Sequence, residues 1–561
     1  MKELQEAKAL VQAMEDGRQT RLPVWRLVQR HILPSRGVFG GETAQSAKEN
    51  ASRRLSSAGT RAIRRTAAGL TSSITPQDLR WFSLTPADRN ILELPNVRTW
   101  LDDIETRMRT ALTNSGFYPA IHNLNMDFTG FACALMFLDS DSDSTMRFED
   151  CAVGTWAVQI DANGKLSSVC RRLKFSANAL KDKYPSTISE HVRQLCESPQ
   201  TSLTEVEIIH LVTPNPQKVA GKIDRISRPW RHLVWEANND SGFLLQGGYY
   251  EMPYFYVVWD KSHSAYGSGP GDDALGDVMQ AQELKRLNLA SANLRVNPPL
   301  LVPTSYQGRV SIAPGSMNRY SAAEADAIRP VLQGLDYNSA ESRAELQATE
   351  SDINDSLMAT IFITTPMEER PPGMTATEFL SRRQERLLQL GPAVSRYMTD
   401  LFDVLARVYN ILDRTGQIPM PPSSITNPGA INISYTSPMA QALKRQGVES
   451  TQAMVDLVFT LAKADQSALD KLNLDEVIDV VAGDIGAPGR IIRSDEETAK
   501  LRQQRAQAAA EAQQAEQARQ ASEIAVKAGA VPMEGTVAGA MAPMLGIPEQ
   551  GQQNKQAGGG A

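Results

Sequence analysis

A long amphipathic segment between residues 376 and 415 constrains the fold of this 561-residue chain more than any other feature. Thr375-Ala376-Thr377-Glu378 has the pattern of a helix capping box, and Pro392 is expected to kink the helix because it has no amide hydrogen to donate. The apolar residues form one narrow helical stripe that ends before Gly416: Leu387, Leu390, Val394, Met398, Leu401, Leu405, Val408 and Leu412. The pattern predicts a long helix that buries one face against other elements.

The sequence before this segment predicts two different kinds of structure. Residues 1 to about 115 indicate helices, near Leu4–Met14, Pro23–Ile32 and Ala44–Ile74. Residues 116 to about 260 favour β-strands, because two short runs of β-forming residues flank the turn Asp161-Ala162-Asn163-Gly164 and three more such runs follow. The fold class is therefore α+β, with a mainly antiparallel sheet.

Two further helices are predicted before the long segment, at about 272–296 and 339–362, with a compact insertion between them. In the second helix one face is acidic, while Leu346, Ile353 and Leu357 lie on the opposite face. Taken alone, the acidic face is more typical of an ordinary solvated helix surface. The four acidic residues are Glu341, Glu345, Asp352 and Asp355.

The C-terminal part predicts helices at about 438–461 and 468–481, then a lone helix at 495–527 that is rich in Ala, Gln, Glu and Arg. A Gly-, Pro- and Gln-rich tail follows at 529–561, and its composition is typical of disorder.

Composition and charge exclude several classes of protein. The net charge of −6 disfavours a protein that grips nucleic acid tightly, because such proteins usually present a basic surface. No apolar run approaches the length of a membrane span or a signal core, so a protein made in the cytoplasm is expected. The cysteines contain no CxxC pair and are expected to be reduced thiols: Cys133, Cys151, Cys170 and Cys196.

A search for catalytic chemistry finds no recognisable motif, so no catalytic, metal or cofactor residue is assigned. The glycine run at 267–271 lacks the spacing of a phosphate loop and fits a helix entry. Asp139, Asp141 and Asp143 could bind Mg²⁺, but a polar turn between strands is favoured. Five arginines could contact phosphates, although a solvated helix face is the simpler interpretation: Arg53, Arg54, Arg61, Arg64 and Arg65.

Several motifs carry a family resemblance that covers roughly residues 5 to 500. They are Trp81-Phe82-Ser83-Leu84 after a helix, Glu251-Met252-Pro253 leading to Trp259, Tyr266-Gly267-Ser268-Gly269-Pro270 before a helix, and Met374-Thr375-Ala376-Thr377-Glu378 after a proline-rich loop. In these features the chain resembles the head-to-tail connecting portal proteins of T7-like podophages. The family usually has basic residues where this chain has Ser268 and Val258, so no role is expected for those charges.

The resemblance implies a multidomain portal fold with wing, stem, clip and crown. The expected parts are the wing helices and sheet at 1–268, stem helix 1 at 269–297, the clip at 298–338, stem helix 2 at 339–362, the channel loop at 363–375, the wing spine helix and strands at 376–436, the crown at 437–494, a barrel-like C-terminal helix at 495–528 and the tail at 529–561.

The resemblance also implies a function without catalysis. A dodecameric ring at the portal vertex of the virion, assembled in the host cytoplasm, would pass double-stranded DNA without sequence specificity. It would bind the terminase large subunit, tail adaptor and nozzle proteins, and the major capsid and scaffolding proteins, but no membrane. Expected channel-lining residues are Glu341, Glu345, Asp352 and Asp355; expected loop neighbours of DNA are Glu368, Glu369, Arg370 and Met374; expected clip contacts are Arg309, Arg319 and Tyr320.

Two other classes of function remain open on the sequence alone. One is an Mg²⁺-dependent nuclease or packaging enzyme, although the Walker A motif of a packaging motor is missing. The other is a cytosolic scaffold that assembles without DNA.

Overall fold

A computed structural model of the chain describes residues 2–39, 54–86, 94–141, 145–219, 224–239, 242–261, 264–296, 300–301, 329–330, 339–362, 390–423, 431–440, 454–461, 472–473, 475–478 and 495–529. The chain divides into two compact units. The first comprises residues 1–92 and 96–489, and the second residues 93–95 and 490–561.

The N-terminal helices agree with the helical pattern of the sequence. They are α1 (Lys2–Gln19), α2 (Leu22–His31), α4 (Ala58–Ile74), α6 (Pro95–Asn114) and α7 (Phe117–Phe131). Helix α7 contradicts the prediction of strands from residue 116. Eleven of its fifteen residues are buried, so it lacks the polar face from which a helical period is read.

Two small sheets lie beside these helices. Strands β2 (Cys133–Asp141), β3 (Thr145–Cys151) and β9 (Tyr254–Val258) form an antiparallel sheet in the order β3-β2-β9. Strand β1 (Phe82–Pro86), from the Trp-Phe motif, pairs antiparallel with β12 (Ile431–Tyr435), which lies almost 350 residues later in the chain. Asp139 and Asp141 belong to β2 and pair with β3, so neither of them lies in a turn as predicted, and Asp143 is outside the described residues.

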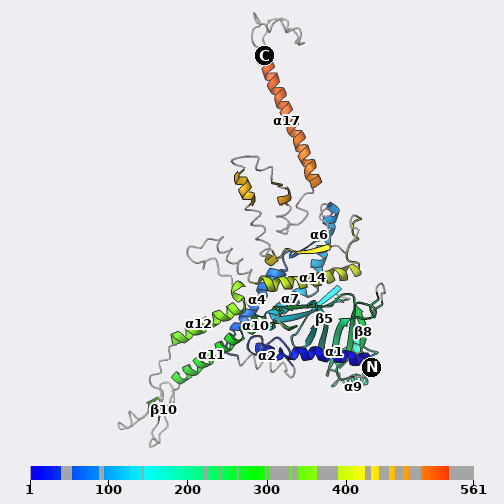
Figure 1. Cartoon of the computed structure of the whole chain (residues 1–561), viewed down its shortest axis with the longest axis vertical. Helices are drawn as coiled ribbons and strands as arrows, with labels where there is room; N and C mark the ends of the chain where they lie inside the picture. Colours follow the sequence, from blue (N-terminus) through cyan, green and yellow to red (C-terminus); the bar gives the residue numbers. More distant parts are fainter. Residues whose placement is uncertain are drawn as a thin grey trace, which may run out of the picture. The chain divides into compact units, whose positions relative to one another are not determined.

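The larger sheet has five antiparallel strands in chain order: β4 (Trp156–Ile160), β5 (Leu166–Ser176), β6 (Glu205–Pro214), β7 (Trp230–Glu236) and β8 (Leu245–Tyr249). The predicted hairpin is confirmed, because β4 pairs with β5 around a turn in which Gly164 has φ +76°. Helix α1 covers one face of this sheet, as Figure 1 shows in dark blue. Helices α8 (Ala177–Lys183) and α9 (Glu190–Leu195) cover part of the other face.

The amphipathic segment forms α14 (Gly391–Arg414), whose stripe is buried from Val394 to Leu412. It packs against β9 and joins a core that includes Trp81, Phe117 and Phe128. Pro392 does not kink the described helix. It lies in the first turn, where a missing amide hydrogen costs nothing. Residues 376–389 of the predicted helix lie outside the described residues.

Between the five-stranded sheet and α14, the chain forms α10 (Pro270–Asp273), α11 (Leu275–Val296), α12 (Ser339–Ser356) and the 3₁₀ helix η2 (Ala359–Phe362). Two short strands pair between α11 and α12, β10 (Leu300–Leu301) and β11 (Arg329–Pro330). The described residues within 438–440, 454–461 and 475–478 are helical, in agreement with the prediction for this region.

In the second unit, α17 (Asp495–Gly529) confirms the predicted lone helix, and its described side chains are almost all exposed. All four cysteines of the chain are free thiols, as expected. Burial raises the pKa of the Cys151 and Cys170 thiols to about 12, so both are inert at neutral pH.

Candidate functional site: an acidic helix pair

Helices α11 and α12 form a pair, and the linker Tyr266–Pro270 attaches this helix pair to the rest of the first unit. Tyr266 is buried and packs edge-on against Trp25, with 5.4 Å between the ring centroids. Its hydroxyl oxygen accepts a hydrogen bond from the Val158 amide at 3.2 Å. Gly267 has φ +63°, and a Cβ there would lie 2.2 Å from the Asp260 carbonyl oxygen. The linker therefore needs an aromatic anchor followed by a residue without a side chain.

Helix α10 then approaches α7 more closely than any side chain would allow. A Cβ on Gly271 would lie 1.9 Å from the Gly130 carbonyl oxygen. Arg21 of the α1–α2 junction binds the Asp272 carboxylate at 2.6 Å, and the same carboxylate accepts the Gly269 amide hydrogen. These contacts fix the start of the helix pair to the body of the first unit.

Helices α11 and α12 run antiparallel, since their polar contacts connect progressively earlier residues of α11 to later residues of α12. Asn288 accepts a hydrogen bond from the Ser342 hydroxyl, Lys285 pairs with Glu350 at 3.1 Å, and Asp277 accepts one from the Ser356 hydroxyl at 3.2 Å. Figure 1 shows the two helices side by side. Ile353 and Leu357 are fully buried at the base of the pair.

The predicted acidic face of α12 is exposed along its whole length. Glu341, Glu345, Asp352 and Asp355 all carry exposed side chains. Leu346 is half-buried, and together with Ile353 and Leu357 it lies on the packed side, as the helical period predicts. The structure thus brings the four carboxylates onto one solvent-facing surface.

The predicted helix 339–362 ends earlier than its pattern suggested. Helix α12 stops at Ser356, Met358 takes a positive φ of 57°, and η2 follows. The Leu357 carbonyl accepts a hydrogen bond from the buried Thr66 hydroxyl at 2.7 Å. Phe362 lies against Gly69 of α4, where a Cβ would be 2.1 Å from its ring. Tertiary contacts with α4 thus end the helix.

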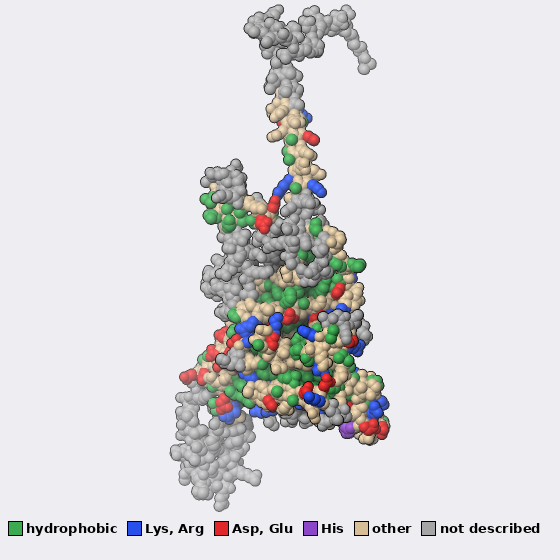
Figure 2. All heavy atoms as spheres, turned by 45° about the vertical axis from the view of Figure 1, so that its right-hand side comes forward, with side chains coloured by type: hydrophobic (Ala, Val, Ile, Leu, Met, Phe, Trp, Pro, Cys, Tyr) green, Lys and Arg blue, Asp and Glu red, His purple; other side chains and the backbone are tan. Residues whose placement is uncertain are grey.

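The arginines in α4 and in the segment before it have mixed surroundings. Arg54 donates to the Ile32 carbonyl at 3.1 Å, and burial lowers its pKa. Arg61 lies 3.8 Å from Glu350, whereas Arg64 and Arg65 are exposed. On the face drawn in Figure 2, basic and acidic side chains are interspersed rather than gathered into one basic field. The exposure of Arg61, Arg64 and Arg65 agrees with the solvated-surface interpretation, whereas Arg54 is part-buried.

Several predicted site residues lie outside the described part of the chain. They are Glu368, Glu369, Arg370 and Met374 of the loop, Arg309, Arg319 and Tyr320 of the insertion, and also Arg53 and Asp143. Among the described residues, no group of three or more His, Cys, Asp or Glu side chains is placed to hold a metal ion. In the same part of the chain, no helix combines the length and the apolar character of a membrane span.

Comparison with known proteins gives the family to which the chain belongs. A family model described as bacteriophage head to tail connecting protein matches residues 4–492, so the chain belongs to this family.

Two curated relatives are similar over most of their length. The portal protein of Salmonella phage epsilon15 is 27% identical over 455 residues, which cover 80% of this chain and 81% of the relative. The probable portal protein of Bordetella phage BPP-1 is 25% identical over 526 residues, 92% of this chain and 93% of the relative.

Solved structures give a weaker likeness. The neck of an empty gene transfer agent particle matches with a TM-score of 0.38 and 12% identity, over 80% of this chain and 95% of the other. The virion of a native gene transfer agent particle matches with a TM-score of 0.35 and the same identity and coverage. This likeness is too low to support an inference about the chain.

Proposed function

We propose that this chain is a portal subunit, which forms a ring at one capsid vertex and provides the channel for packaging and ejecting double-stranded DNA. The observation that carries the proposal is the family match across residues 4–492, supported by two relatives named as portal proteins. The protein then resides in the virion, after assembly in the host cytoplasm.

The exposed acidic face of α12 suits the wall of such a channel. DNA must slide through the channel. A channel wall with few cations displaces few counterions from the DNA phosphates, so no position along the DNA is bound strongly. The carboxylates of Glu341, Glu345, Asp352 and Asp355 are exposed and supply this weakly repulsive surface. Base-reading groups would give a sequence-specific grip that stalls translocation.

Exposed apolar side chains on α11 suit contact between neighbouring subunits of a ring. Three large apolar side chains remain substantially exposed on this helix: Met279 at 40%, Leu287 at 48% and Leu289 at 55%. A neighbouring copy that covered them would remove apolar surface from water. Leu287 and Leu289 lie two positions apart and therefore point to different sides of the helix. A closed homo-oligomer, expected to be a dodecamer, places a neighbour on each side of every subunit and so accounts for apolar side chains exposed on two sides of α11.

The remaining parts take their proposed roles from the family. The helices α11 and α12 form the stem, residues 298–338 the clip that meets the terminase large subunit and the tail adaptor, and residues 363–375 the loop nearest DNA. Residues 1–268 and 376–436 form the wing, 437–494 the crown, and 495–528 a barrel-like helix. Nozzle, capsid and scaffolding proteins complete the set of proposed partners.

The proposal contains no catalytic step. Purified protein should show neither nuclease nor ATPase activity. Either activity, if lost on substitution of an acidic cluster, would favour the packaging-enzyme alternative.

Negative-stain imaging of the purified chain tests the ring directly. The expected result is a population of rings with a central hole. Rings that form but never associate with DNA or capsids would favour the scaffold alternative, and a monodisperse monomer would contradict both.

Charge reversal tests the acidic face. Replacing Glu341, Glu345, Asp352 and Asp355 with lysine should leave rings intact but impair packaging or ejection, because the new cations bind passing phosphates. A control with the same charge change uses four exposed acidic residues elsewhere: Glu6, Asp16, Asp182 and Glu190. Equal phage yield from both variants and the parent would refute the channel assignment.

A further inference from the structure

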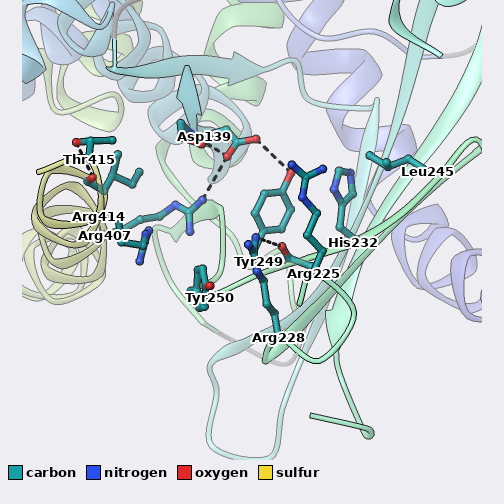
Figure 3. Close-up of a pocket in the computed structure, with 14 residues that line it drawn as sticks. Asp139, Arg225, Arg228, His232, Leu245, Tyr249, Tyr250, Arg407, Arg414 and Thr415 are labelled. Atoms are coloured by element: carbon teal, nitrogen blue, oxygen red, sulfur yellow. Dashed lines mark hydrogen bonds and ion pairs between the residues drawn. The ribbon is translucent and has the colours of Figure 1, made fainter. Parts of the chain in front are cut away.

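An arginine-lined pocket lies away from the helix pair, where β2, β8 and the second half of α14 meet. It has a volume of about 460 Å³. Figure 3 shows the arginines entering from two sides, Arg407 and Arg414 from α14 and Arg225 and Arg228 from the segment before β7, with Tyr249 and Tyr250 between them. Asp139 is the carboxylate that the described lining contributes.

The α14 side of the pocket is electrically balanced. Glu251 binds Arg414 through both carboxylate oxygens, at 2.7 and 3.1 Å, and binds Arg407 at 3.1 Å. Asp139 lies 3.7 Å from Arg407 and accepts a hydrogen bond from the Tyr249 hydroxyl at 3.4 Å. Two carboxylates thus match the two guanidinium groups of α14.

The opposite side carries positive charge without such a match. Among the described residues, neither Arg225 nor Arg228 forms an ion pair with a carboxylate, and nearby Asp224 accepts a hydrogen bond from the Ser227 amide. Arg225 is exposed. Arg228 donates one bond, at 2.9 Å, to the Gly248 carbonyl, and its Nε is buried without an acceptor. This local excess of positive charge stands out in a chain with a net charge of −6.

Two of the arginine side chains, Arg228 and Arg414, are held in place before any ligand arrives. The guanidinium carbon of Arg228 lies 4.3 Å from the centroid of the Tyr250 ring, and that of Arg414 lies 5.1 Å from the same centroid. Stacking on an aromatic ring fixes the plane of a guanidinium, so less conformational entropy is lost when it binds an anion.

We propose that this pocket binds a phosphate group, with Arg225 and Arg228 as its principal ligands and Tyr250 as the platform that orients Arg228. A planar guanidinium donates two parallel hydrogen bonds to two oxygens of a tetrahedral phosphate, and two arginines together match its charge. The phosphate comes either from a free phosphate ion or from a nucleic-acid backbone, and both present the same oxygens to the pocket.

Calorimetric titration of the full-length protein with inorganic phosphate, at ionic strength held constant with chloride, tests the site. Arg225→Gln and Arg228→Gln should each weaken phosphate binding roughly tenfold or more, since a hydrogen bond to a charged group contributes about 1.5–3 kcal/mol. Arg26→Gln, which removes an exposed arginine on α2, is the matched control and should bind phosphate like the parent.

Two further measurements keep the result interpretable. Arg228→Lys keeps the positive charge but loses the two parallel N–H donors of the guanidinium. Phosphate binding between that of the parent and that of Arg228→Gln, at an unchanged unfolding temperature, separates the loss of a ligand from misfolding. A short DNA duplex that competes with phosphate, and binds more weakly to the same variants, identifies the backbone as the source; a duplex that does not compete identifies the free ion. Phosphate binding no stronger than that of chloride, or equal losses in Arg26→Gln, would overturn the site. Either failure leaves ring formation, and hence the proposed portal role, untouched.

Discussion

Gly271 offers the sharpest test of how the helix pair is seated. Replacing it with alanine places a Cβ 1.9 Å from the Gly130 carbonyl oxygen. Non-bonded carbon–oxygen contacts are normally about 3.3 Å or longer, so α10 and α7 would have to separate by roughly 1.4 Å. Both sides of this contact are backbone, and no rotamer change can relieve it.

The energetic cost follows from that geometry. Overpacking typically costs about 1–3 kcal/mol, and the absence of any relaxing side chain places Gly271→Ala at or above about 3 kcal/mol. For a unit of this size that corresponds to a fall of roughly 3 °C in the unfolding temperature. The displaced α10 also shifts the start of α11, so ring formation should weaken.

Gly276→Ala is the matched control, five residues along the chain. A Cβ at Gly276 has no atom within 4 Å, and alanine is the better helix former by about 1 kcal/mol. Differential scanning calorimetry should therefore show Gly271→Ala melting below the parent and Gly276→Ala at or above it. Equal melting of Gly271→Ala and the parent would refute the close approach of α10 to α7.

Two further predictions concern carboxyl groups, one half-buried and one fully buried. Burial raises the pKa of Asp400 to about 6, so the folded state holds its proton more tightly than the unfolded state, and the free energy of unfolding should fall as pH rises from 4 through 6. Asp400→Asn should flatten this slope in urea titrations at pH 4.5 and 7, while Asp413→Asn, exposed on the same helix, should retain it. Arg36 binds Asp127 at 2.6 Å and Asp150 at 3.0 Å. Since Asp127 is fully buried, Asp127→Asn should cost about 3–5 kcal/mol in urea unfolding, Asp150→Asn less, and equal losses would contradict the burial argument.

Local patterns in the sequence were sufficient to predict the elements that have one polar and one apolar face. The stripe ending at Leu412, the hairpin around Gly164 and the acidic face of α12 are all present as predicted. Helix α7 was missed because most of its residues are buried, and a helix without a polar face has no visible period.

Contacts between residues far apart in the chain could not be predicted from the sequence. Nothing local indicates that Phe82 pairs with Tyr435, or that Thr66 binds the Leu357 carbonyl and so helps to end α12 at Ser356. The arginine pocket was missed for the same reason, since Arg228 and Arg414 stand almost two hundred residues apart and meet only on the ring of Tyr250.

The sequence by itself determined the α+β class, the position of α14, the two helices of the pair and the family motifs around Tyr266 and Trp81. These depend on periodicity, turn chemistry and residue identity, which act over a few neighbouring positions. The tertiary structure alone decided where α12 ends, why Gly271 tolerates no side chain and which arginines share one pocket, because each of these depends on atoms that only folding brings within a few ångströms of one another.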